Sequence, residues 1–123
     1  MQNALLWIVV YTFILAASQI ILKIGVSQIG GFKIHNLNDF FALIIPILTN
    51  PMLILGVVLM GATFLAWMYI LSWFKLSVVF PLTALTYVFV AIMASLVLGE
   101  KLLLINYLGI LLIAGGIFCL LYK

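Results

Sequence analysis

Polar side chains that can bind a substrate are few in this sequence, and three of them lie close together in its first apolar stretch. Ser18, Gln19 and Lys23 fall within about one and a half helical turns, and Gln19 and Lys23 share a helix face through their i, i+4 spacing. A lysine ammonium in such a place can bind a phosphate, or its long stem can carry the charge out to water. Gln19 can contact a substrate or bridge two helices. We predict Ser18, Gln19 and Lys23 as substrate-binding residues, with a structural role as the alternative.

Hydroxyl and aromatic side chains form a second candidate group. Thr83 and Tyr87 share a helix face through their i, i+4 spacing and can offer hydroxyl groups to a polar ligand. The alternatives are a threonine that bonds its own backbone and a tyrosine that anchors at a membrane interface. Trp67 lies deeper in its apolar stretch than Trp7 or Trp73, so we include Trp67 among the candidate substrate-binding residues.

Residue sets typical of enzymes, metal centres and nucleic-acid-binding proteins are missing from the sequence. His35 has no second potential metal ligand nearby, and there is no Ser-His-Asp, paired-carboxylate or phosphate-loop pattern. The five basic residues are scattered lysines, whereas a nucleic-acid-binding surface needs them clustered. We expect a protein that is not an enzyme, holds no cofactor or metal, and binds no nucleic acid.

Long apolar stretches must position the candidate residues. Of the 123 residues, 69% are hydrophobic and 6% are charged, whereas soluble domains have about 45–50% and about 25%. Four stretches, about residues 4–25, 52–74, 76–98 and 102–122, each reach the length of about 20 residues that crosses a hydrocarbon core of roughly 30 Å. The first lacks the basic start and the cleavage pattern of a signal peptide, so we expect it to be retained. The sequence predicts an all-α membrane protein with a single four-helix transmembrane domain over residues 1–123.

The connection between the first two spans is long enough to hold structure of its own. It is polar and glycine-rich as far as Asp39, and about residues 39–49 are then apolar again but too short to cross a membrane. Asn38 or Asp39 can cap a short interfacial or re-entrant helix there, and Asn50 can cap the second span. The other two turns are short, which makes consecutive helices antiparallel neighbours. Lysines are nearly balanced between the two sides, so their distribution predicts no orientation. Other features can fix the orientation, and insertion in both orientations is the alternative.

Small residues indicate surfaces where helices can pack closely. Gly109 and Gly116 in the last span are seven residues apart, about two helical turns, which places both on one face. We predict that this face forms the interface of a dimer, with packing inside one protomer as the alternative. Gly56 and Gly61 in the second span are expected to contact helices of the same protomer.

Two parts of the sequence carry a resemblance to a known superfamily. The first begins at Lys75 and reads KLSVVFPLTALTYVFVAIMASLVLGEKLLLINYLGILLIAGGIFCLL, with an early proline, a small-residue face, a Gly-Glu-Lys turn and a glycine-rich last helix. The pattern continues upstream in AASQIILKIGVSQ and in NPMLILGVVLMGATFLAWMYILSWFKLS, which includes the Asn-Pro entry to the second span. Over nearly its whole length the chain resembles the drug/metabolite transporter superfamily, in its four-helix small-multidrug-resistance-like and EamA-like branches.

Within this superfamily the chain departs from the small multidrug resistance branch. That branch carries a first-helix glutamate, eight residues before a lysine, which binds protons and cationic drugs in turn. Counting back from Lys23 places that position at Leu15, and the first span has no acidic residue. The chain is more similar to the paired small subunits proposed to flip 4-amino-4-deoxy-L-arabinose-phosphoundecaprenol, which also lack the glutamate. Ser18, Gln19 and the extra segment 39–49 match that branch.

The resemblance implies a flippase that moves an undecaprenyl-phosphate-linked sugar or amino sugar, or a similar lipid, across the bacterial inner membrane. It also implies a partner, either a second copy of the chain or a related small subunit, held through the face of Gly109 and Gly116. Two alternatives remain open. One is an exporter of small molecules or cations, and the other is an accessory membrane subunit that transports nothing itself.

Overall fold

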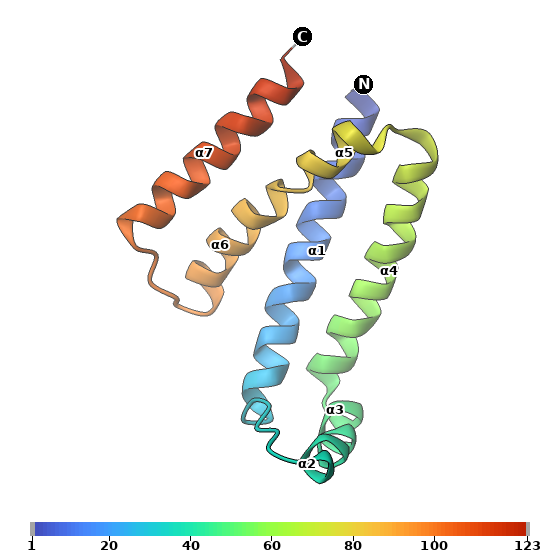
Figure 1. The fold of residues 1–123 in the computed structure, drawn as a ribbon, viewed down its shortest axis with the longest axis vertical. Helices are drawn as coiled ribbons and strands as arrows, with labels where there is room; N and C mark the ends of the chain where they lie inside the picture. Colours follow the sequence, from blue (N-terminus) through green and yellow to red (C-terminus); the bar gives the residue numbers. More distant parts are fainter. Residues whose placement is uncertain (1, 123) are drawn as a thin grey trace.

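The computed structural model describes residues 2–122, and within this range the regular structure consists only of helices (Figure 1). In chain order these are α1 (Gln2–Gln28), α2 (Leu37–Ala42), α3 (Ile44–Thr49), α4 (Pro51–Trp73), α5 (Leu76–Leu82), α6 (Leu85–Val97) and α7 (Leu104–Leu121). Four segments are long and apolar enough to cross a membrane, namely Leu5–Gln28, Pro51–Trp73, Leu76–Val97 and Leu104–Leu121. The prediction of an all-helical protein with four spans and a shorter apolar helix is confirmed.

The first span extends further than its predicted end near residue 25, because α1 continues to Gln28. Two glycines then stop it. Gly30 and Gly31 have φ of +80° and +76°, a left-handed conformation that glycine adopts without steric cost. Their N–H groups donate to the carbonyls of Ser27 and Val26, which satisfies the end of the helix.

The third span is two helices, α5 and α6, where the sequence predicts one continuous helix over 76–98. Pro81 lies inside α5 and has no N–H to donate. Beyond it the N–H of Ala84 donates to the Pro81 carbonyl at 3.1 Å, and that of Thr86 donates to the Thr83 carbonyl at 2.9 Å. These i to i+3 bonds are of the tighter 3₁₀ type, so the axis changes between α5 and α6.

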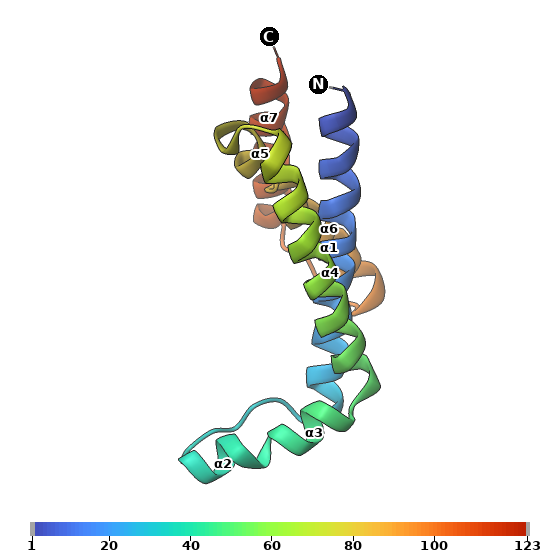
Figure 2. The same cartoon turned by 90° about the vertical axis from the view of Figure 1, so that its right-hand side faces the viewer.

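The short apolar segment after the first loop is split into α2 and α3 at Leu43. Its N-cap is Asn36, two or three residues before the predicted Asn38 or Asp39. Asp39 instead accepts hydrogen bonds from the N–H groups of His35 and Asn36, at 3.0 and 3.2 Å, through its Oδ2 atom. Figure 2 shows α2 and α3 extending away from the long helices at one end of the bundle, an arrangement typical of an interfacial segment.

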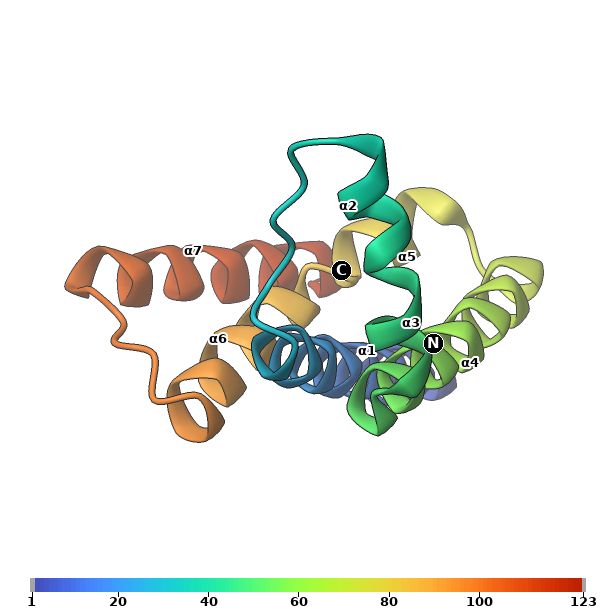
Figure 3. The ribbon, with the colours of Figure 1, turned by 90° about the horizontal axis from the view of Figure 1, so that it is seen from below.

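Helix α1 is the centre of the bundle. Figure 3 shows it between α4 and α6, the two elements with which it makes most of its contacts, with α7 on the side away from α4. A small core of Ile8, Ile70, Val79 and Leu82 joins α1, α4 and α5. The turns after α1 and α6 lie at one end of the bundle, and the two chain ends lie at the other with the α4–α5 turn (Figure 1).

Candidate functional site

A cavity of about 490 Å³ lies among α1, α4, α5 and α6, and we call it the hydroxyl cavity. It contains four of the six predicted substrate-binding residues, which come from three different spans. The lining residues are Tyr11, Leu15, Gln19, Trp67, Phe80, Thr83, Thr86, Tyr87 and Val90. Side chains that are far apart in the sequence therefore meet at one open cavity between the helices.

Helix α1 supplies one wall of this cavity through a regular series. Tyr11, Leu15 and Gln19 are spaced by four residues, and such residues lie one above another on a helix face. Lys23 continues the series beyond the cavity. Leu15 is the position that counting back from Lys23 assigns to the acidic residue of the small multidrug resistance branch. The hydroxyl cavity is therefore lined at that position by an aliphatic group and not by a carboxylate.

Aromatic rings form the second wall. The rings of Tyr11 and Trp67 are stacked, with centroids 5.4 Å apart and planes at 26°. Phe80 follows, with its ring centroid 6.3 Å from that of Trp67. Flat ring faces of this kind offer apolar surface next to polar edges, which suits a ligand that has both. Trp67 is thus placed between α1 and α5 and does not face the lipid like a ring of an aromatic belt.

Hydroxyl groups gather at the break between α5 and α6. The Thr83 hydroxyl donates to the carbonyl of Phe80 at 2.6 Å, so it bonds its own backbone, and only its oxygen lone pairs stay available to a ligand. Thr86 Oγ1 is buried and has no hydrogen-bond partner among the described residues. Tyr87 is 67% exposed. The break therefore brings two threonines and a tyrosine to the cavity wall, and the Thr86 hydroxyl has no partner among the described residues.

A second cavity of about 350 Å³ contains charged groups, and we call it the charged cavity. Lys23 of α1 and Glu100 of the α6–α7 turn both line it. The lining residues are Gln19, Ile20, Leu22, Lys23, Val26, Val90, Ala94, Leu98 and Glu100. Gln19 and Val90 also line the hydroxyl cavity, so the two cavities are neighbours along α1 and α6.

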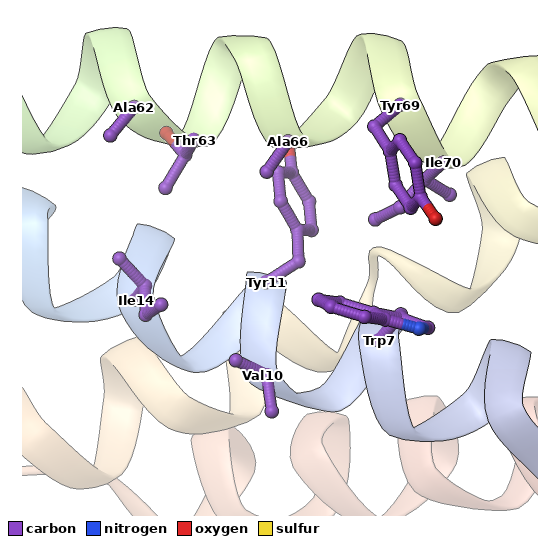
Figure 4. A pocket seen from close by; sticks show the side chains of 9 residues that line it. All are labelled: Trp7, Val10, Tyr11, Ile14, Ala62, Thr63, Ala66, Tyr69 and Ile70. Atoms are coloured by element: carbon purple, nitrogen blue, oxygen red, sulfur yellow. The ribbon is translucent and has the colours of Figure 1, made fainter.

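A groove of about 400 Å³ lies between α1 and α4 at the other end of α1, and Figure 4 shows its lining side chains. It is mostly apolar and aromatic, with the rings of Trp7 and Tyr69 edge to face at 5.9 Å. The Thr63 hydroxyl in this groove donates to the carbonyl of Met60 at 2.8 Å. Tyr11 lines both this groove and the hydroxyl cavity. Three adjoining hollows thus follow α1, apolar near Trp7, hydroxyl-rich in the middle and charged near Lys23.

The remaining predicted residues lie elsewhere. Ser18 is fully buried, its hydroxyl donates to the Leu15 carbonyl at 2.7 Å, and it lines none of these three hollows. Gly109 and Gly116 of α7 face open space, since a Cβ added to either would meet no described atom within 4 Å. Packing inside the protomer therefore does not account for these two glycines. Gly61, predicted to pack within the protomer, also has no such neighbour.

Three residues that bring a hydroxyl or carboxylate group to the hydroxyl and charged cavities, namely Tyr11, Thr86 and Glu100, were not predicted from the sequence. Tyr11 could have been found by extending the Gln19 and Lys23 spacing back by eight residues. Thr86 lies one turn after Thr83, so the same helical spacing points to it. Glu100 lies in the turn after α6, and no sequence spacing relates it to Lys23. Within residues 2–122, no three His, Cys, Asp or Glu side chains gather closely enough to hold a metal ion.

Four apolar spans with hollows between them define a multi-pass membrane protein. The sequence matches the EamA-like transporter family over residues 2–122, and the chain belongs to that family. The predicted membership of this four-helix transporter group is thereby confirmed.

Two curated relatives are distantly similar to the chain. One is the probable 4-amino-4-deoxy-L-arabinose-phosphoundecaprenol flippase subunit ArnF of Proteus mirabilis (strain HI4320), 29% identical over 129 residues, covering 100% of this chain and 95% of that protein. Another is the corresponding subunit ArnE of Enterobacter sp. (strain 638), 34% identical over 68 residues. That match covers 55% of this chain and 64% of ArnE, less than two thirds of its length. No solved structure matches the chain.

Proposed function

We propose that this chain is a lipid flippase that moves a polyprenyl-phosphate-linked sugar across the bacterial inner membrane. The single observation that carries the proposal is the hydroxyl cavity, which combines an amide, hydroxyl groups and stacked rings inside the bundle without a carboxylate. Hydroxyl and amide groups bind a sugar by hydrogen bonds, and ring faces cover its apolar side. The names of the ArnE and ArnF relatives agree with a substrate of this class.

The neighbouring charged cavity contains a positive charge that can bind the phosphate of such a substrate. Lys23 follows Gln19 by four residues and so lies about one turn further along the same face of α1. Its ammonium can therefore bind a phosphate while Gln19 contacts the sugar. The long hydrocarbon tail of such a substrate needs no binding site of its own, because it can remain in the bilayer. The proposed binding residues are Gln19, Lys23, Trp67, Thr83 and Tyr87, together with Thr86.

A complete pathway needs a second subunit in this proposal. Helix α7 has no buried side chain within residues 104–121, and its glycines leave room for another helix to approach closely. We propose that Gly109 and Gly116 contact a second copy or a related small subunit. Transport by alternating access would then rock the two protomers about a shared site, with the α5–α6 break as the flexible point.

Reconstitution into vesicles tests this function. The purified chain should move a fluorescent polyprenyl-phosphate sugar between leaflets, and Gln19→Ala and Lys23→Ala should each lower the rate about tenfold, since a hydrogen bond to a charged group contributes roughly 1.5 kcal/mol or more. Ser27→Ala is the matched control, because Ser27 is on the same helix, is exposed and lines none of the three hollows. Unchanged flipping in both cavity variants would contradict the assigned site.

The same vesicles separate the other candidate functions. Export of quaternary ammonium compounds without lipid flipping would identify a cation exporter. Failure to move either substrate, both alone and with a co-expressed small subunit, would indicate an accessory protein. Circular dichroism of each preparation shows whether a loss of transport comes from unfolding.

A further inference from the structure

We propose that the charged cavity recognises a lipid head group that carries a phosphate and an amine at once, with Lys23 binding the phosphate and Glu100 binding the ammonium group. This inference rests on the proposed function and specifies the substrate class of that site. Its starting point is that one cavity of about 350 Å³ is lined by a lysine and a glutamate from different parts of the chain. A cavity of this size falls in the range of small-molecule sites.

The chain has only two acidic residues, and they are engaged differently. Asp39 is used locally, since its carboxylate accepts the N–H groups of His35 and Asn36 in the loop before α2. Glu100 lies in the α6–α7 turn, and it lines the cavity that Lys23 also lines. Glu100 is therefore the carboxylate available to an amine next to the proposed phosphate site.

The backbone around Glu100 holds this residue against the cavity wall. Gly99 has φ of +67°, which turns the chain sharply after α6. The N–H of Glu100 then donates back to the carbonyl of Ala94 at 3.3 Å, and Ala94 is only 7% exposed and lines the same cavity. The position of Glu100 is thus set by the helix end and not by a free loop.

The rest of the cavity is lined by Gln19, which is uncharged, and by apolar side chains of α1 and of the end of α6. An ammonium and a carboxylate set apart across a cavity match a ligand with the opposite charges at its two ends. A head group with a phosphate alone would leave the carboxylate as a like charge in the same cavity, which disfavours it. The pair therefore selects for the aminated head group as well as binding it.

Two classes of lipid offer this chemistry, an amino sugar linked to polyprenyl phosphate and phosphatidylethanolamine. Binding to the purified full-length chain in detergent can be measured for both, and for a polyprenyl-phosphate pentose that lacks the amine. The wild-type chain should bind the aminated sugar lipid about fivefold more tightly than the amine-free one, as expected for about 1 kcal/mol from a partly exposed ion pair.

Three variants test whether Lys23 binds the phosphate and Glu100 binds the ammonium group. Glu100→Gln should weaken binding of the aminated lipid about fivefold and should not weaken binding of the amine-free lipid, because it removes a like charge from the cavity, whereas Lys23→Gln should weaken both. Lys101→Gln is the matched control, because Lys101 follows Glu100 in the same turn and does not line the cavity. If phosphatidylethanolamine shows the same dependence on Glu100, the site binds the shared chemistry and bulk phospholipid is a second source of ligand.

Equal binding of the aminated and amine-free lipids by the wild-type chain would overturn the inference, as would an equal effect of Glu100→Gln on both. The flipping assay is read separately. Amine-selective binding without flipping would refute the flippase function and leave the site standing, whereas flipping that is indifferent to the amine and to Glu100 would refute only the assignment of the charged cavity.

Discussion

Two pairs of glycines in this protein occupy opposite environments. On the inner side of the bundle, a Cβ on Gly25 would lie 2.7 Å from the Leu53 side chain, and one on Gly56 would lie 2.6 Å from the Leu22 side chain. On α7, a Cβ on Gly109 or Gly116 would meet no described atom within 4 Å. The first pair lets α1 and α4 pack closely, and the second pair leaves a surface open.

The difference shows which helices pack closely within the chain and which helix has an unpacked face. Lipid is as apolar as a leucine side chain, so helices in a membrane associate through close packing and polar contacts and not through the hydrophobic effect. The α1–α4 pair has both, because Asn50 Nδ2 at the start of α4 also donates to Gln28 Oε1 at the end of α1, at 3.1 Å. Helix α7 contacts only α5 and α6 to any extent. Its outer face is where we propose that a partner subunit binds.

The largest expected effect comes from filling the α1–α4 contact. Gly56→Leu should destabilise the protomer by about 1–3 kcal/mol, because the new side chain overlaps Leu22 and forces the helices apart. Unfolding in mixed dodecyl maltoside and SDS micelles, followed by circular dichroism, measures it. Gly61→Leu is the matched control on the same helix and should cost little, since Gly61 faces open space. Equal costs for the two variants would show that the close α1–α4 packing is not formed.

A smaller effect is expected at the start of α4. Asn50 Oδ1 accepts the N–H groups of Met52 and Leu53 at 2.9 and 3.1 Å, so Asn50→Ala should cost about 1 kcal/mol of unfolding free energy. The corresponding residue before α7 is Leu103, whose side chain makes no capping hydrogen bond among the described residues. Leu103→Ala should therefore change stability less than Asn50→Ala in the same SDS titration. A larger loss at Leu103 would mean that α7 is held more firmly than its contacts indicate.

The smallest expected effect on the protomer is at the open glycines. Gly116→Leu should change the unfolding free energy by no more than about 0.5 kcal/mol, because no described side chain is displaced. It should nevertheless weaken subunit association about tenfold or more, measured by energy transfer between labelled chains in detergent. Ala114→Leu adds similar bulk to another face of α7 and should leave association unchanged. If Gly116→Leu associates normally, the α7 glycine face is not the interface.

Some of the site could be predicted from helical spacing alone. Gln19 and Lys23 share a face of α1, because periodicity operates within a single helix. The same spacing paired Thr83 with Tyr87, and both reach one cavity although the break between α5 and α6 separates them. Gln19, Trp67, Thr83 and Tyr87 then line one cavity. Ser18, predicted with its neighbour Gln19, points into the packed interior, since residues one apart on a helix differ by about 100° in direction.

Contacts between helices could not be predicted from helical spacing. A glycine in the sequence permits a close approach but does not say which helix approaches, so Gly61 was expected to pack and does not. Gly25, which does pack, carries no sequence signal that separates it from a loop glycine. The break at Thr83 depends on how the backbone hydrogen bonds rearrange after Pro81, which a proline permits but does not dictate.

The sequence by itself determined four apolar spans, their order, and the lack of an acid in the first span. These follow from chain length, hydrophobicity and residue type, which act locally along each segment. Only the tertiary structure decided that Lys23 and Glu100 line one cavity and that Gly109 and Gly116 face outward. Such pairings arise from the packing of one helix on another, where the fit of side chains across the contact, and not their order in the chain, selects the neighbours.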